Sequence, residues 1–194
     1  MSAKPPVILV HGFMYSGRRM EPMARYLRKR GWEVYTVDML PSWGQIGIDQ
    51  LAKNLASFLE RTFDPHTTIN LVGFSMGGLT CRYYVQRMDG LARTEKLITI
   101  SSPHRGTVMA NCSERPACIQ MRPRSKFLTD LNRDAMTLEK AKFASIWTPL
   151  DLMIFPAKSS SLGVGREQKL WIGAHPLMVL QPSALKVVAE LLEN

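Results

Sequence analysis

The chain has 194 residues, of which 45% are hydrophobic and 21% are charged. This length and composition suit one globular domain, residues 1–194, and exclude a disordered or fibrous chain. No apolar run approaches the ~20 residues of a membrane-spanning helix, and residues 1–6 lead into an apolar stretch without the pattern of a signal peptide. We therefore expect a cytoplasmic protein.

The formal net charge is +9, from 25 basic and 16 acidic residues. Basic side chains gather at 18–19, 25–30 and 122–126. A solvated basic face is the ordinary explanation of such clusters, and peripheral contact with an anionic membrane surface is the second. No recognisable nucleic-acid module accompanies the charge, so we expect no nucleic-acid partner. We expect a monomer.

Short apolar runs alternate with amphipathic segments along the chain. In chain order the first half predicts a strand at 7–10, a helix at 18–30, a strand at 32–37, a loop at 40–47, a helix at 49–63, a strand at 68–72, a helix at 78–88 and a strand at 97–100. The second half predicts an irregular segment at 103–142 with a helical stretch at 125–138, strands at 143–147 and 168–172, and a helix at 182–192. The alternation predicts an α/β protein with one doubly wound, mostly parallel sheet of about six strands and helices on both faces.

A Gly-x-Ser-x-Gly pattern, Gly73-Phe74-Ser75-Met76-Gly77, stands between the predicted strand at 68–72 and the helix that follows it. A tight strand-to-helix turn strains its central residue, and glycine at Gly73 and Gly77 removes side chains that would collide there. Such a turn holds the Ser75 hydroxyl clear of the sheet, beside a helix N-terminus. The pattern predicts Ser75 as a catalytic nucleophile.

A serine nucleophile needs a base and a group that orients the base. Both should come from loops at the carboxyl ends of later strands. Asp151 follows the predicted strand at 143–147, and His175 follows the one at 168–172. The chain order Ser, Asp, His is the one that this architecture produces, so we predict a triad of Ser75, Asp151 and His175.

Other histidines and acids are less well placed. His66 precedes a strand and should face the opposite edge of the sheet, and His104 has no later strand that sets it against Ser75. The acids that follow a strand on the far side of Ser75 or lie on a predicted helix are Asp38, Asp130 and Asp134.

The loop after the first strand predicts part of an oxyanion hole. Backbone N–H groups must point at the oxygen that becomes negative in the tetrahedral intermediate. The residue after the nucleophile, Met76, supplies one donor. Phe13, in His11-Gly12-Phe13, is the predicted second donor, because Gly12 lets the backbone approach closely.

Taken together, these motifs resemble the small bacterial lipases and esterases of the α/β-hydrolase superfamily, the minimal group without a large lid domain. The matching stretches are Ile8–Phe13, residues 73–78, Ser102–Thr107, Asp151 and His175. The resemblance implies an α/β-hydrolase fold and a carboxylic-ester hydrolase acting on acylglycerols or other lipid esters, with no metal or organic cofactor. It implies that His104 and Arg105 are wall or packing residues. The 103–142 segment is longer than in the most compact members and could form a small flap over the acyl site.

Three further questions stay open at this stage. An acyltransferase or thioesterase would use the same three residues, and an inert binding protein could keep the same fold. Cys81, Cys112 and Cys118 form no metal-ligand pattern. Cys112 and Cys118 could pair as a disulfide in an exported protein and would stay free thiols in the cytosol.

Overall fold

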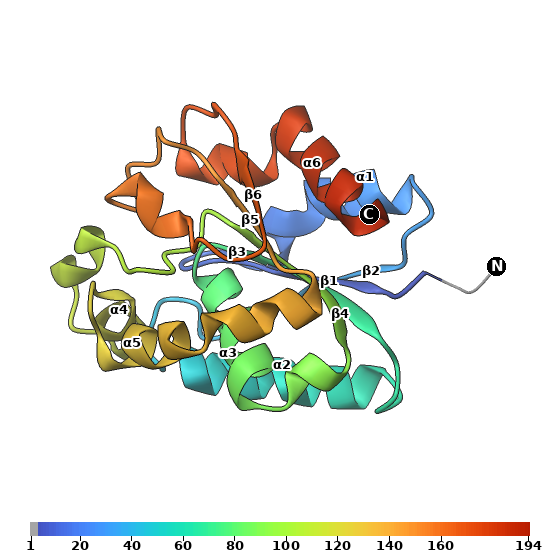
Figure 1. Cartoon of the computed structure of the whole chain (residues 1–194), viewed down its shortest axis with the longest axis horizontal. Helices are drawn as coiled ribbons and strands as arrows, with labels where there is room; N and C mark the ends of the chain where they lie inside the picture. The colour runs from blue at the N-terminus through green and yellow to red at the C-terminus, as the bar shows by residue number, and fades with distance from the viewer. Residues whose placement is uncertain (1–3) are drawn as a thin grey trace.

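The computed structural model describes residues 4–194 and contains one sheet of six strands, all parallel (Figure 1). The spatial order is β2-β1-β3-β4-β5-β6. The strands are β1 (Val7–Val10), β2 (Val34–Val37), β3 (Ile69–Phe74), β4 (Thr94–Ile100), β5 (Ala144–Trp147) and β6 (Arg166–Lys169). The predicted doubly wound α/β-hydrolase sheet is thus confirmed, with every strand pair parallel.

The strand order reverses between β1 and β3. The chain runs from β1 outward to β2, then returns to the other side of β1 and continues outward through β6. At such a reversal the loops that leave the two neighbouring strands diverge and open a crevice at their carboxyl ends. The segments that follow β1 and β3, namely residues 11–13 and 75–77, therefore meet at the point in the sheet most suited to a site.

Helices cover both faces of the sheet. In Figure 1, α1 (Glu21–Arg28) and α6 (Pro182–Glu193) lie on one side, with α2 (Ile48–Thr62) and α3 (Met76–Arg87) on the other. The helix predicted at 18–30 is a 3-10 turn, η1 (Gly17–Met20), followed by α1, because Pro22 suits the first turn of a helix better than its interior.

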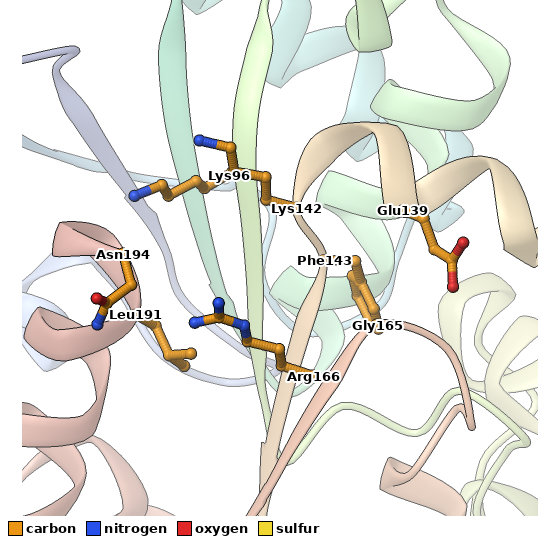
Figure 2. Close-up of a pocket in the computed structure, with 8 residues that line it drawn as sticks. All are labelled: Lys96, Glu139, Lys142, Phe143, Gly165, Arg166, Leu191 and Asn194. Atoms are coloured by element: carbon orange, nitrogen blue, oxygen red, sulfur yellow. The ribbon is translucent and has the colours of Figure 1, made fainter.

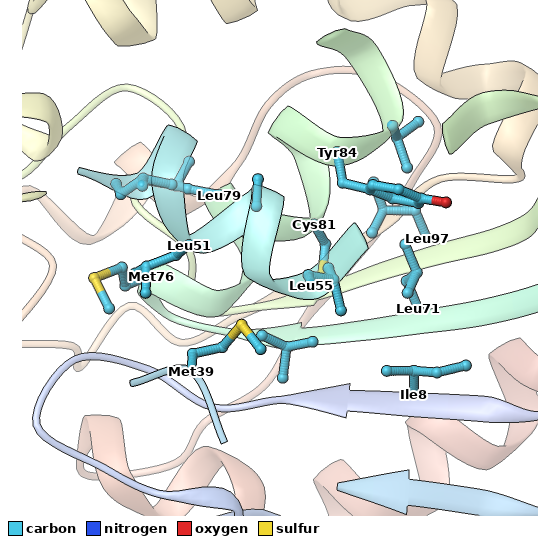
Figure 3. Packing of buried hydrophobic residues seen from close by; sticks show 14 of the residues in the cluster. Ile8, Met39, Leu51, Leu55, Leu71, Met76, Leu79, Cys81, Tyr84 and Leu97 are labelled. Atoms are coloured by element: carbon cyan, nitrogen blue, oxygen red, sulfur yellow. The ribbon is translucent and has the colours of Figure 1, made fainter. Parts of the chain in front are cut away.

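Alternate side chains of β1 pack against the helix layers on opposite faces of the sheet. Val7 and Leu9 pack with α1 and α6, whereas Ile8 and Val10 pack with α2 and α3. Figure 3 shows the second layer, where Leu55, Leu79 and other helix side chains lie over the strands. Each fully buried aliphatic side chain of this kind contributes about 1.5–3 kcal/mol of transfer free energy, so both layers hold the sheet in place.

The 103–142 segment is more helical than predicted. It contains η3 (Val108–Cys112), α4 (Pro116–Met121), α5 (Lys126–Arg133) and η4 (Ala135–Ala141). The stretch predicted as one helix at 125–138 breaks at Asp134, where the α-helix gives way to the 3-10 helix. Leu128 and Leu131 turn the inner face of α5 into the core, so this segment packs beside α3 as part of the body.

The last strand differs from its predicted position. The prediction of 168–172 followed the apolar residues, but β6 is Arg166–Lys169, and all four of its residues are exposed. β6 is an edge strand held by main-chain hydrogen bonds to β5, so its formation needs no apolar side chains. Leu170 N still donates to Trp147 O (2.8 Å), and the chain then turns toward His175.

All three cysteines are free: Cys81 and Cys118 are buried and Cys112 is exposed. Burial raises the pKa of the Cys81 thiol. Across residues 4–194, no helix is both long and apolar enough to span a bilayer. Within the same residues, no three His, Cys, Asp or Glu side chains are grouped as a metal site would require.

Candidate active site

The turn between β3 and α3 holds Ser75 in a strained conformation, with φ of 54° and ψ of −123°. Such a conformation costs about 1–3 kcal/mol in a residue with a side chain. Ser75 N donates to Ile100 O (2.8 Å), and Ser75 O accepts from Gly78 N (3.0 Å), so main-chain bonds hold the turn. Ser75 is 7% exposed. The backbone of Ser75 is therefore fixed at the N-terminus of α3.

Close packing explains the glycines of this turn. A Cβ on Gly73 would lie 2.5 Å from Gly78 Cα, and one on Gly77 would collide with the carbonyl oxygens of Val10 and His11. Both positions therefore exclude any larger residue. The contact at Gly77 also shows that the turn presses against the loop after β1.

That loop reaches Ser75 through Gly12. A Cβ on Gly12 would lie 2.8 Å from Ser75 Cβ. Over residues 4–194, the N–H groups of Phe13 and Met76 donate to no other group of the chain. Both N–H groups are therefore free to serve as the donors that the sequence predicts for an oxyanion hole.

His11 fixes the loop from within. Its Nδ1–H donates to Gly12 O (2.8 Å), while its Nε2 accepts from Met39 N (2.8 Å), which assigns the tautomer from the hydrogen-bond pattern. The imidazole is fully buried, and this burial lowers its pKa and keeps it neutral. His11 therefore connects the loop after β1 to the residues that follow β2 and holds that loop in position.

Replacing Gly12 by alanine is expected to lower kcat/KM for an ester about 10- to 100-fold, because the new Cβ would push Phe13 N–H from its position beside Ser75. Steady-state hydrolysis of a short-chain ester measures the effect. Gly173→Ala is the matched control, because nothing lies within 4 Å of a Cβ there. Equal activities of the two variants would contradict the assignment of Phe13 as a donor.

His175 and Asp151 form a buried pair at the same edge of the sheet. Asp151 follows β5, and His175 begins η6 (His175–Val179) after β6. His175 Nδ1–H donates to Asp151 Oδ2 (2.7 Å), so Nε2 is the ring nitrogen that stays available to act as a base. The other carboxylate oxygen, Oδ1, accepts from Met153 N and Ile154 N (both 2.9 Å). Asp151 is therefore fixed by its own loop.

The pair lies close to the turn that holds Ser75. The His175 ring lies 4.8 Å from the ring of Phe74, the residue before Ser75. Throughout residues 4–194, no hydrogen bond joins Ser75 to His175. Catalytic hydrogen bonds in ligand-free structures are often long and tighten when substrate binds. The predicted groups thus meet at one edge, with the Ser75–His175 contact still open.

The other histidine and acids that the sequence offered make structural contacts. His66 is an exposed turn residue, and Asp38 accepts from Gly17 N (2.6 Å). Asp130 and Asp134 both bind Arg87, which holds the pKa of Asp134 below its usual value. These contacts account for each group without a catalytic role.

His104 belongs to a buried network that the sequence did not predict. Arg82, fully buried on α3, donates to His104 Nδ1 (3.2 Å), Asn132 Oδ1 (3.1 Å) and Leu131 O (3.0 Å). Burial lowers the pKa of Arg82 to about 9, and burial next to Arg82 lowers that of His104 far below its usual value. The only signal in the sequence is that Arg82 comes three residues after Leu79, on the buried face of the helix.

Replacing Arg82 by methionine is expected to lower the free energy of unfolding by about 3 kcal/mol, because two buried acceptors and one partly buried acceptor each lose a donor at a cost of ~1 kcal/mol or more. Urea unfolding measures this. Arg133→Met is the matched control, because its side chain is 77% exposed and binds only Asp130. If both variants unfold alike, the network does not bind α5 to α3.

Comparison with known proteins agrees with this architecture. The family model described as palmitoyl protein thioesterase matches residues 6–136. A lysosomal thioesterase PPT2-B of Xenopus laevis is 28% identical over 110 residues, which is 52% of this chain and 36% of that protein. A triacylglycerol lipase of Pseudarthrobacter phenanthrenivorans is 28% identical over 114 residues, which is 55% of this chain and 35% of that protein. The matches thus span about a third of each of these relatives.

Solved lipase structures share the fold. The mature lipase BlEst2 of Bacillus licheniformis superposes with a TM-score of 0.79 at 18% identity, covering 99% of this chain and 93% of that one. Lipase B of Aspergillus fumigatus gives 0.80 at 16% identity, covering 98% of this chain and 53% of that one. The family match runs from the start of β1 into η4 and includes Ser75, whereas Asp151 and His175 lie beyond it. The chain belongs to the palmitoyl protein thioesterase family, within the α/β-hydrolase fold.

Proposed function

We propose that this protein is a serine hydrolase that cleaves carboxylic esters of lipids through an acyl-enzyme. Ser75 is the nucleophile, His175 the general base and acid, and Asp151 the group that orients His175. The observation that carries the proposal is the buried His175–Asp151 hydrogen bond at the strand edge where Ser75 is held in its strained turn. The family match and the lipase-like fold support the same reaction class.

The reaction has two balanced steps. Ser75 Oγ attacks the ester carbonyl carbon while His175 Nε2 takes its proton. The N–H groups of Phe13 and Met76 bind the negative oxygen until the C–O bond breaks and the alcohol leaves with that proton. Water then attacks the acyl-enzyme, gives its proton to His175, and the acid leaves as Ser75 regains its hydrogen.

Thioester hydrolysis is the second candidate, and the family match favours it. A thioester would pass through the same acyl-enzyme, with a thiol as the leaving group. Comparing kcat/KM for an ester and a thioester of the same acyl chain separates the two substrates. Adding an alcohol acceptor to the trapped acyl-enzyme detects an acyltransferase, and labelling by a fluorophosphonate excludes an inert binding protein.

Exposed apolar side chains lie at the same edge of the sheet as the candidate site and support a lipid substrate. They lie on the loops that leave the carboxyl ends of the strands and on α4, which packs against those loops. We call these residues the apolar rim: Met14, Leu40, Trp43, Val108, Met109, Ile119, Leu150, Leu152, Met153, Phe155 and Trp171. A water-soluble, polar substrate gives no reason to leave so many large apolar groups at one edge.

Cations stand beside the two tryptophans of the apolar rim. Arg115 donates to Trp43 O (2.7 Å), with its guanidinium 6.0 Å from the Trp43 ring, and Lys169 Nζ lies 4.9 Å from the Trp171 ring. Tryptophan next to a cation suits the boundary between lipid tails and anionic headgroups. We therefore propose that the apolar rim touches a lipid surface while the substrate enters.

A double variant, Leu152→Ser with Trp171→Ser, is expected to lower hydrolysis of aggregated long-chain esters at least tenfold, since it removes the two most exposed side chains of the apolar rim. Hydrolysis of a dissolved short-chain ester should stay within about twofold. Met136→Ser is the control, because Met136 is 62% exposed on η4, outside the apolar rim. Equal losses on both substrates would contradict a role in contacting lipid.

The oligomeric state and the compartment stay predictions: a monomer in the cytoplasm. Light scattering of the purified protein and fractionation of its cells test the two predictions.

A further inference from the structure

A pocket of about 230 Å³ lies at the amino edge of the sheet, opposite the candidate active site. β4 and β6 begin there, and α6 ends there. Its lining residues are Lys96, Glu139, Lys142, Phe143, Gly165, Arg166, Leu191 and Asn194 (Figure 2). The volume is several times the ~30 Å³ that one water occupies in the liquid, so the pocket admits an ion of several atoms.

Three cationic side chains from three segments line this pocket. Figure 2 shows the charged ends of Lys96, Lys142 and Arg166 on the same side, with the Glu139 carboxylate turned the other way. Across residues 4–194, the Arg166 guanidinium has no hydrogen bond or ion pair. Lys142 Nζ pairs with Glu95 at 3.1 Å. The pocket lining therefore carries three positive charges and one negative charge, that of Glu139, and Glu95 offsets Lys142 from outside the lining.

Burial disfavours the charged form of Lys96. The residue is only 5% exposed, and its ammonium donates to one neutral acceptor, Leu192 O. An ammonium has three donors, and a buried charge is stable only when it is compensated. Burial lowers the pKa of Lys96, and the neighbouring Lys142 and Arg166 lower it further, although Glu95 and Glu193 act against them. Capping the C-terminus of α6 accounts for Lys96, whereas Arg166 is exposed on β6, where its guanidinium is free to bind an anion.

The backbone around the pocket is tightly built. Lys142 has φ of 39° and Gly165 has φ of 64°, and a Cβ on Gly165 would collide with Phe143 O. The turns that present Lys142 and Arg166 are therefore held in place before any ligand arrives, so binding costs little loop ordering.

We propose that this amino-edge pocket binds a phosphate group, either free or carried by a small molecule or a lipid headgroup. The planar guanidinium of Arg166 can hold two phosphate oxygens, while the two ammonium groups act as point charges. The bound anion would add its negative charge to that of Glu95 and Glu193 beside Lys96. The site is separate from the proposed hydrolytic centre and stands independently of it.

Calorimetric titration with inorganic phosphate at constant ionic strength tests the pocket. We expect saturable 1:1 binding, weakened at least tenfold in Arg166→Gln and in Lys142→Gln. Lys140→Gln is the matched control, because it removes the same charge from η4 outside the pocket lining. The Ser75→Ala variant should bind phosphate as the wild type does, so the result does not depend on the hydrolase proposal.

Parallel titrations with glycerol 3-phosphate and with vesicles containing phosphatidic acid separate the sources of the phosphate group. Tighter binding of one of them than of inorganic phosphate, lost in Arg166→Gln, identifies the natural carrier class. The proposal is overturned if none of the three probes binds saturably, or if Lys140→Gln weakens binding as much as Arg166→Gln does.

Discussion

Replacing Ser75 by alanine is expected to lower kcat/KM for a short-chain ester by roughly 10⁴- to 10⁶-fold, because no other group in the turn can form the acyl-enzyme. The residual rate would come from the backbone donors of Phe13 and Met76 and from substrate binding. Hydrolysis assays with wild-type and variant enzyme measure the loss, and fluorophosphonate labelling should disappear with it.

The fold of this variant should stay intact, because the main-chain bonds of residue 75 to Ile100 O and from Gly78 N do not involve the hydroxyl. Circular dichroism and urea unfolding check this. Ser183→Ala is the control, since Ser183 is exposed on α6, away from the carboxyl edge. Unchanged ester hydrolysis by the Ser75→Ala enzyme would remove Ser75 from the mechanism.

Replacing Asp151 by asparagine is expected to lower kcat about 10⁴-fold at neutral pH. The asparagine amide would donate to His175 Nδ1, so the ring would carry its proton on Nε2 and could not accept one from Ser75. The carbonyl oxygen of the new side chain can still accept from Met153 N and Ile154 N, which should keep the loop folded.

Steady-state kinetics at neutral pH and urea unfolding together test this prediction. Asp64→Asn makes the same chemical change on an exposed turn at the amino edge and should leave kcat within twofold. A loss of less than tenfold in Asp151→Asn would mean that Asp151 is not the group that orients His175. A large loss of stability would instead assign Asp151 to holding its own loop.

The buried Arg82 network bears on how the active site opens. It binds α5 to α3, the helix that begins at the nucleophile, and Asn132 Nδ2 also donates to His104 O (2.9 Å). Arg87 adds two ion pairs between the same helices. Opening a flap at α5 would expose these buried polar contacts, so the network favours α5 as a fixed wall. A small effect of Arg82→Met would restore the flap hypothesis.

The positions of residues at the carboxyl ends of the strands explain why much of the candidate site could be predicted. In a parallel sheet all carboxyl ends share one edge, so a serine after β3, an acid after β5 and a histidine after β6 must lie along that edge. Periodicity, together with the Gly-x-Ser-x-Gly pattern and the chain order, therefore predicted that Ser75, Asp151 and His175 lie along one edge of the sheet. The same logic predicted that residues after β1 meet the turn at Ser75.

Other features could not be predicted because they depend on contacts between distant segments. The four residues of β6 are all exposed and form a strand only by pairing with β5. The pattern of apolar residues therefore placed this strand too far along the chain. The buried hydrogen bonds of His104 and Arg82 depend on α5, which lies about 50 residues along the chain from Arg82. No local pattern in the sequence encodes such a pairing.

The sequence by itself determined the class of sheet, a doubly wound parallel one, and the tight turn at Ser75, because both depend on local periodicity and on steric demands within a few residues. The roles of Ser75, Asp151 and His175 stay predictions. The tertiary structure alone decided that His11 is a neutral loop anchor, that Arg82 joins α5 to α3, and that Lys96, Lys142 and Arg166 share one pocket. These depend on burial and on charges brought together from separate elements, which exist only once the layers have packed.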